Sequence, residues 1–281
     1  MCDFCHKHGE GRIWYLEAKN YAEDLLSDLR RRGMIQHFFL RPERSKAGVD
    51  SLERLERAPS FVRRVLTWGL VKRQQKHHYG QVVPIEEVER IFGFVTSIAR
   101  VACFCRQATV GREQRYCYGV SMAPNGGQLI QLIREIDVSY LTGPQTQGIE
   151  MLDRTEALES LRQHEHEGLC HTVWTFITPY IAGICNCDRS DCLAMQATVK
   201  RQFPVMFRAE YVAAADPDLC NGCRQCMRVC QFGAIGYSAA NKKVEIDVRR
   251  CYGCGVCRAV CAKSAISLLV RSSVPVAAHL W

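Results

Sequence analysis

The sequence predicts an α+β protein with an N-terminal helical region, an α/β middle domain and a C-terminal domain built by internal duplication. Apolar residues recur at helical spacing before residue 82, and β-branched runs alternate with helical segments from 83 to 207. Two similar cysteine-rich segments then follow each other at an offset of 31 residues. A length of 281 residues, 47% of them hydrophobic, allows two or three domains. We therefore divide the chain into 1–82, 83–207, 208–270 and a tail, 271–281.

The first region is expected to be helical. Apolar side chains step at intervals of three and four residues through Trp14, Ala18, Tyr21, Leu25 and Leu29. This pattern predicts a helix over 11–32 that ends at Gly33, and further helices are predicted at 50–58 and from Ser60 to about His78. The first 100 residues hold 18 Lys or Arg against 13 Asp or Glu. This basic excess suits either a solvated helical surface or a docking face for an acidic partner or a nucleotide, and Trp14, Tyr15 and Trp68 are candidate exposed aromatics for docking.

The middle domain mixes helices and strands. Pro84 opens a predicted helix to about Phe92, and a second helix is predicted from Thr155 to Glu167. Residues 93–105 and 172–177 are rich in β-branched and aromatic residues, which predicts strands. Each of these strands leads into a pair of cysteines.

Two Cys-x-Cys pairs, each followed by one more cysteine, look like two halves of one metal site. They are Cys103 and Cys105 with Cys117, and Cys185 and Cys187 with Cys192. In a strand, Cys103 and Cys105 would point to the same face. We expect a third [4Fe–4S] cluster on Cys105, Cys117, Cys187 and Cys192, with Cys103 and Cys185 as near-equal substitutes. Zinc bound by four of these thiols and buried inert thiols are the alternatives.

A third cysteine group opens the chain. Cys2, Cys5 and His6 form the string of a c-type haem attachment site, but no export signal precedes them. We interpret them as a candidate site for zinc or part of a further cluster, with a frayed terminus as the alternative.

The C-terminal segments carry the strongest motif. Eight of the 17 cysteines form two runs with the same spacing, Cys220-x2-Cys223-x2-Cys226-x3-Cys230 and Cys251-x2-Cys254-x2-Cys257-x3-Cys261. Three thiolates spaced by two residues can wrap one loop around an iron–sulfur cube. Paired zinc knuckles and a disulfide scaffold are the alternatives, but zinc prefers two separated pairs, and the missing export signal argues against disulfides.

Residues 208–270 resemble the dicluster 2[4Fe–4S] ferredoxin family. The resemblance implies a pseudo-twofold domain in which each run gives its last cysteine to the other run's cluster. One cluster would then use Cys220, Cys223, Cys226 and Cys261, and the other would use Cys251, Cys254, Cys257 and Cys230. The family usually has proline after each last cysteine, whereas Gln231 and Ala262 stand here. The middle region only weakly resembles anaerobic iron–sulfur proteins with a CxCR motif.

Other polar groups are weaker candidates. His164, His166 and His171, with Glu165 and Glu167, suggest either a solvated helix end or a proton-transfer site. Arg106, Arg112 and Arg115 lie near the first cysteine pair, where they suit contact with an anionic substrate, compensation of the charge on a cluster, or surface ion pairs. No glycine-rich nucleotide motif is present in the sequence, and we assign no catalytic residue.

These patterns favour an electron-transfer subunit that passes electrons between a redox carrier and a partner oxidoreductase in anaerobic metabolism. The alternatives are a stand-alone iron–sulfur reductase with a substrate site in the middle domain, and a redox or iron sensor. No apolar run of 18 residues and no signal peptide occur, so we expect a cytoplasmic protein without a membrane span. We do not expect a nucleic-acid partner, and a salt-dependent titration would detect one.

Overall fold

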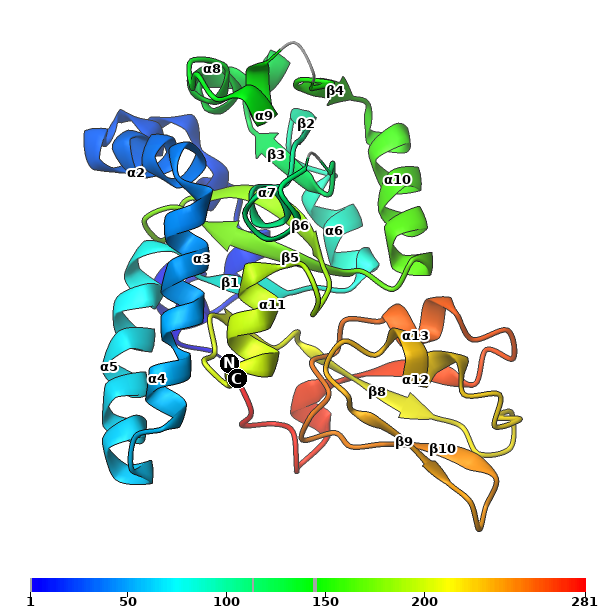
Figure 1. The fold of residues 1–281 in the computed structure, drawn as a ribbon. Helices are drawn as coiled ribbons and strands as arrows, with labels where there is room; N and C mark the ends of the chain where they lie inside the picture. Colours follow the sequence, from blue (N-terminus) through cyan, green and yellow to red (C-terminus); the bar gives the residue numbers. More distant parts are fainter. Residues whose placement is uncertain (1, 113, 144–145) are drawn as a thin grey trace.

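The computed structural model describes residues 2–112, 114–143 and 146–281. It confirms the α+β class: helices surround a seven-stranded mixed sheet, and two small two-stranded sheets form a C-terminal body beside it (Figure 1). Among the helices of these ranges, none combines the length and apolar character needed to cross a membrane.

The large sheet brings the middle-domain cysteines together. Its strands, in spatial order, are β4 (Glu150–Leu152), β2 (Ser97–Val101), β3 (Cys117–Ser121), β6 (Ile181–Cys187), β5 (Cys170–Thr175), β1 (Gly80–Val82) and β7 (Met206–Phe207). Neighbours are antiparallel except β1 and β7, which are parallel. Register places Cys117 opposite Cys185 and Cys170 opposite Cys187. Cysteines that are far apart in the chain therefore meet at the centre of the sheet.

Helices pack around this sheet (Figure 1). They are α1 (Asp3–His8), α2 (Leu29–Leu40), α3 (Pro42–Ser51), α4 (Glu53–Glu56), α5 (Ser60–His77), α6 (Ile85–Ile91), α7 (Phe104–Val110), α8 (Gly127–Arg134), α9 (Ser139–Thr142), α10 (Arg154–His166) and α11 (Leu193–Met195), which continues as a π-helical turn over Gln196–Lys200. The predicted helices at 60–78, 84–92 and 155–167 are confirmed as α5, α6 and α10. Asp153 and Glu156 form a capping box that fixes the start of α10.

The helix predicted over 11–32 is wrong. Three short 3₁₀ turns, Trp14–Leu16, Ala18–Tyr21 and Glu23–Ser27, occupy most of that segment, and α2 then runs straight through Gly33. Trp14 and Tyr15 are both fully buried, so their expected exposure is also wrong. The residues that flank these turns, Ile13, Glu17 and Ala22, have extended backbone, so the chain changes direction within the segment and its aromatic side chains are buried on more than one side.

Two other boundaries differ from the prediction. The predicted helix at 50–58 overlaps the end of α3, and α4 covers only Glu53–Glu56. The strand expected through Cys105 ends at Val101, and Cys103 stands at the N-cap of α7. Cys105 therefore reaches the site from a helix, not from a strand.

The C-terminal body repeats one unit twice. Its elements are β8 (Tyr211–Ala215), α12 (Gln225–Val229), β9 (Ile235–Ser238), β10 (Lys243–Ile246), α13 (Val256–Ala259) and β11 (Ile266–Val270). Strand β8 pairs with β11, and β9 pairs with β10. The amide of Asp216 donates to Ala265 O, and the amide of Asp247 donates to Ala234 O, both at 2.8 Å. These equivalent bonds show the pseudo-twofold arrangement that the repeat predicts.

The ends of the chain pack onto the main core. Phe4, Trp14 and Tyr15 share a buried cluster with residues of α6 and of the sheet. Trp281 is partly buried against the same cluster, and the Arg271 guanidinium lies 3.4 Å from the centre of its ring. The tail is therefore folded back on its own chain.

Candidate metal centres

The two cysteine runs have equivalent backbone environments. Gly222 and Gly253 have positive φ values of 70° and 71°, a conformation that favours glycine. A Cβ on either residue would meet a backbone oxygen, at 2.3 Å for Gly222 and 2.0 Å for Gly253. The sulfurs of Cys230 and Cys261 accept equivalent backbone N–H bonds, from Ala234 at 3.2 Å and from Ala265 at 3.3 Å. Such N–H···S contacts stabilise the thiolates that hold iron–sulfur clusters, so these loops fit the group.

Each run's last cysteine lies near the other run. Burial raises the pKa of the Cys226 thiol to about 11, and the neighbouring thiols of Cys223 and Cys261 add to the shift. A small cavity in the other half is lined by four cysteines, Cys230, Cys251, Cys254 and Cys257. These two neighbourhoods have the composition of the crossed ligand sets.

The six paired cysteines of the middle domain form one continuous group of thiols. The sulfurs of Cys117 and Cys185 are 3.4 Å apart, and those of Cys187 and Cys192 are 3.2 Å apart. Cys103 hydrogen-bonds to Cys105 and Cys117, and Cys105 hydrogen-bonds to Cys192. The order of contact is therefore Cys185, Cys117, Cys103, Cys105, Cys192 and Cys187. We call these residues the six-thiol site.

Hydrogen bonds within the six-thiol site shift the pKa values of its thiols in opposite directions. Contacts with Cys105 and Cys117 lower the pKa of Cys103, and Arg106 adds to the effect. Contacts with Cys105 and Cys187 lower the pKa of Cys192, and the contacts with Cys103 and Cys192 raise the pKa of Cys105 and of Cys187. Thiolate is the form of cysteine that binds metals, so the buried Arg106 cation favours the ligand form of Cys103.

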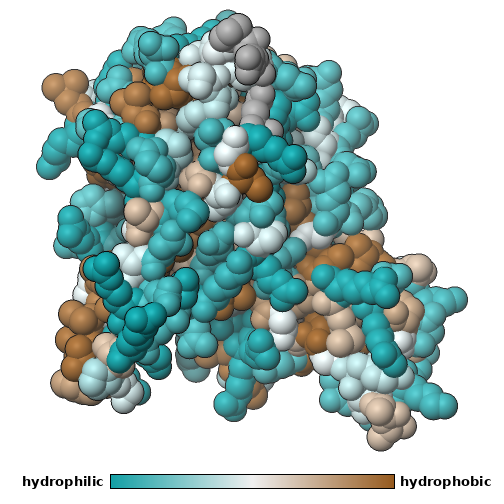
Figure 2. Space-filling view, viewed as in Figure 1, coloured by the Kyte–Doolittle hydropathy of each residue, from teal (hydrophilic) through white to brown (hydrophobic). Residues whose placement is uncertain are grey.

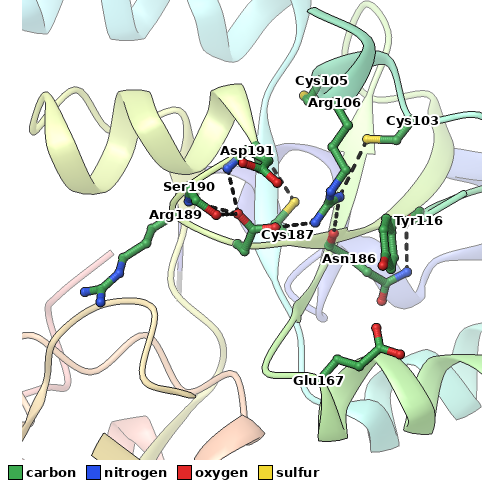
Figure 3. A network of polar contacts seen from close by, with 12 residues as sticks. Cys103, Cys105, Arg106, Tyr116, Glu167, Asn186, Cys187, Arg189, Ser190 and Asp191 are labelled. Atoms are coloured by element: carbon green, nitrogen blue, oxygen red, sulfur yellow. Dashed lines mark hydrogen bonds and ion pairs between the residues drawn. The ribbon is translucent and has the colours of Figure 1, made fainter. Parts of the chain in front are cut away.

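Arg106 links the six-thiol site to the loop after β6. Figure 3 shows its side chain extending from α7 between Cys103 and Asn186. It donates to Asn186 O at 3.2 Å, lies 3.8 Å from the Cys103 sulfur and forms an ion pair with Asp188. Only 2% of Arg106 is exposed, so its cation offsets negative charge on the thiols and on Asp188 in a buried setting. Arg115 instead pairs with Glu150 at 2.9 Å, and Arg112 is exposed.

A large cavity adjoins the six-thiol site. It has a volume of about 640 Å³, and all six cysteines line it. Much of the remaining wall is aromatic, from Phe38, Phe39, Phe104, Trp174 and Phe176. His77 and His78 at the end of α5 supply polar groups, and burial lowers the pKa of His78 to about 4. The cavity therefore combines sulfur ligands with an apolar, aromatic wall, as small-molecule and cofactor sites do.

The histidine cluster differs from a solvated helix end. His164, Glu165 and His171 are buried, while His166 and Glu167 are exposed. The Tyr118 hydroxyl lies 2.9 Å from His164 Nε2, and the Asn186 side chain lies 2.6 Å from His171 Nδ1. Three of the five side chains are therefore part of the packed interior, His171 from β5 and His164 and Glu165 from the end of α10.

The N-terminal candidate is only partly assembled. The sulfurs of Cys2 and Cys5 are 3.4 Å apart and buried, but His6 is exposed. A hydrogen bond from Cys2 lowers the pKa of Cys5 to about 7. Across the described residues, no three or more His, Cys, Asp or Glu side chains surround a single metal-ion position. Ligation by Cys2, Cys5 and His6 stays a prediction.

Two residues near these sites, Cys170 and Gln231, belong to no sequence motif that indicates a metal site. Cys170 is fully buried in β5 opposite Cys187, but it belongs to no spaced cysteine pattern. Gln231 stands out in the sequence only as a replacement for proline, yet its side chain bonds to two middle-domain loops. Only the pairing of β5 with β6 in the structure places Cys170 beside Cys187.

Comparison with known proteins identifies the C-terminal body. Residues 213–262 match the family model of the 4Fe–4S dicluster domain, and this stretch contains all eight cysteines of the two runs. No curated protein matches the chain significantly. The predicted resemblance to dicluster ferredoxins is therefore confirmed for this part of the chain, and such a domain indicates iron–sulfur electron transfer.

Proposed function

We propose that this protein carries electrons through three iron–sulfur centres to or from a partner oxidoreductase, because its C-terminal body is a 4Fe–4S dicluster domain. The proposed ligands of the dicluster domain are Cys220, Cys223, Cys226 and Cys261 for one cluster, and Cys251, Cys254, Cys257 and Cys230 for the other. When bound, each cluster supplies one-electron redox chemistry. The rest of the chain holds, shields and positions these groups.

The observation that carries the proposal is the six-thiol site. Six cysteines from α7, β3, β6 and the start of α11 form one contact chain beside the dicluster domain. A cube needs four thiolates, and we propose Cys105, Cys117, Cys187 and Cys192. Arg106 offsets part of the negative charge that such a set accumulates. A buried charge of this kind is stable only when it is compensated.

The exposed face of α5 supports a role as a subunit. Phe61, Val62, Val65, Leu66 and Trp68 are all exposed, and no residue of this 18-residue helix is buried. In Figure 2 hydrophobic side chains gather at the lower left, where the first half of α5 lies. The helix also carries five Lys or Arg and no Asp or Glu. An apolar and basic surface of this kind suits a partner whose docking site is apolar with an acidic rim.

The cavity of about 640 Å³ favours a second candidate function. Its aromatic wall could receive an apolar substrate next to a centre in the six-thiol site, which would make the chain an iron–sulfur reductase by itself. A substrate that binds there should quench the fluorescence of Trp174, whose ring lines the cavity.

Metal content tests the three-centre proposal. Protein purified without oxygen should contain about twelve irons per chain, and about eight if only the dicluster domain is loaded. A double Cys187→Ala, Cys192→Ala variant should lose about four irons. Cys170→Ala is the matched control, since it removes a neighbouring buried thiol that is not a proposed ligand. Stoichiometric zinc with about eight irons would contradict the third cluster.

A further inference from the structure

The side chain of Gln231 joins the dicluster domain to the middle domain. Its Nε2 donates to Gly168 O at 2.6 Å, and its Oε1 accepts from the Arg189 amide at 2.9 Å. Gln231 follows Cys230, Gly168 lies two residues before Cys170, and Arg189 lies two residues after Cys187. One side chain therefore fixes three cysteine-bearing segments relative to one another.

Packing at this junction is close. Gly168 has a φ of +91°, and a Cβ there would lie 3.3 Å from Val229 Cγ1 at the end of α12. The bare glycine lets the α12 turn approach the loop before β5. A single apolar cluster contains Cys170, Cys187 and Cys192 together with Phe232 and Val256, and partly buried Cys254 packs against it. The second cysteine run and the six-thiol site thus share one core.

Cys170 lies between the two groups of thiols. Cys170 stands opposite Cys187 where β5 pairs with β6. It shares its buried cluster with Cys192, and Cys254 of the second run packs against the same cluster. Cys170 therefore contacts both sides of the junction. In the first run, by contrast, Cys223 is exposed to solvent.

We infer that the second cysteine run is the inner site of the dicluster domain, held against the six-thiol site by Gln231 as a positioning residue and separated from it by Cys170. The first run, with Cys223 exposed, is then the outer site that faces external redox proteins. Proline cannot replace Gln231 here, because its ring has neither the donor for Gly168 nor the acceptor for Arg189. This inference deepens the proposed function and rests on it.

The internal repeat supplies a matched pair of variants for the test. Gln231→Pro and Ala262→Pro introduce the same residue at equivalent positions of the two runs, but only Gln231 bonds to the middle domain. Gln231→Leu keeps the size of the side chain but removes its polar atoms. It is the second test variant, for the case in which proline disturbs folding. All variants are prepared as the full chain without oxygen, and iron is counted in each.

Two readouts report on the junction. Electron paramagnetic resonance of the reduced protein should show a magnetic coupling that is absent from the Cys187→Ala, Cys192→Ala reference and therefore involves the six-thiol site. That coupling should be lost or reduced in both Gln231 variants and retained in Ala262→Pro. Hydrogen exchange at the Arg189 amide should become roughly tenfold faster in the Gln231 variants, because its acceptor is gone.

The outcomes separate the inference from the proposed function. Coupling and Arg189 exchange that stay unchanged in both Gln231 variants would overturn the inference, as would an equal effect of Ala262→Pro. Wild-type protein with about eight irons and no third centre would instead defeat the proposed function. In that case the exchange of the Arg189 amide still decides whether Gln231 holds the second run in place.

Discussion

Glu165 is a buried carboxyl group beside the second cysteine run. It is 5% exposed, and its Oε1 would lie 3.4 Å from a Cβ on Gly255, in the loop between Cys254 and Cys257. Burial raises its pKa from 4.5 to about 7. The folded protein thus binds more protons than the unfolded chain between these two pH values, and this contribution to stability decreases as pH rises through that window.

Glu165→Gln should therefore stabilise the protein at pH 8 by up to about 3 kcal/mol, and by less than about 1 kcal/mol at pH 5, where the unfolded chain is only partly ionised at this position. The amide stays neutral, whereas the wild-type carboxylate is ionised and buried at the higher pH. Denaturant unfolding without oxygen at the two pH values measures the difference. Glu159→Gln, at an exposed position of the same helix, is the control. An effect of equal size at both pH values would contradict the burial argument.

Cys261 tests the crossed ligation of the dicluster domain. Replacing it with alanine should remove a ligand from the cluster of the first run, so that Cys220, Cys223 and Cys226 become reactive to alkylation. Cys251, Cys254 and Cys257 should stay protected. Mass spectrometry of the alkylated protein reads out both sets at once. Cys230→Ala is the reciprocal control, and exposure of the second run by Cys261→Ala would refute the crossing.

Residues in a fixed spacing could be predicted from the sequence, and residues that act through tertiary contacts could not. The eight cysteines and Gly222 and Gly253 follow from local geometry, since three thiols and a tight turn must lie in one loop. Gln231 has its role only because two loops of the middle domain lie within reach of its side chain. Local sequence contains no trace of that proximity.

At the scale of elements, the spacing of apolar residues predicts a helix correctly where only one face of the helix packs. The same spacing gives a wrong prediction where tertiary contacts bury side chains on several sides. Helix α10 has a capping box and buries Ala157 and Leu161 on one side, so its pattern was sufficient. Residues 14–21 have a similar spacing, but their aromatic side chains are buried on several sides at once. The sequence likewise predicts Cys103 and Cys105 in a strand, because the turn into α7 contains no proline or glycine that would indicate the end of the strand.

Two tryptophans allow a test of how much stability each environment contributes, because one is fully buried and the other is exposed on a helix. Trp14 is fully buried and packs edge-on against Phe4 at 5.0 Å, so Trp14→Ala should destabilise the protein by about 3–5 kcal/mol. Trp68 on α5 is 66% exposed, so Trp68→Ala should change stability by no more than about 0.5 kcal/mol. Denaturant unfolding of the two variants measures both values. A large loss of stability in Trp68→Ala would mean that the exposed first half of α5 packs against its own chain.

At the scale of the whole molecule, the dicluster domain is attached by specific polar contacts as well as by packing. Tyr211 donates to Glu87 at 2.7 Å, Arg258 pairs with Glu86, and Gln231 bonds to both loops described above. Glu86 and Glu87 belong to α6, at the edge of the middle domain. These contacts hold the domain in one orientation, which electron transfer over a fixed distance requires.

The exposed half of α5 leads to the last prediction, that the chain works as a subunit. Gentle purification from the native cell without oxygen should recover it together with a larger oxidoreductase. Phe61→Ser with Trp68→Ser should abolish that association, since these are the two most exposed aromatic residues of the helix. Iron content and stability should stay at wild-type values, because α5 buries none of its residues and holds no proposed ligand. A wild-type monomer that reduces a small substrate with only an added electron carrier would instead establish the reductase function.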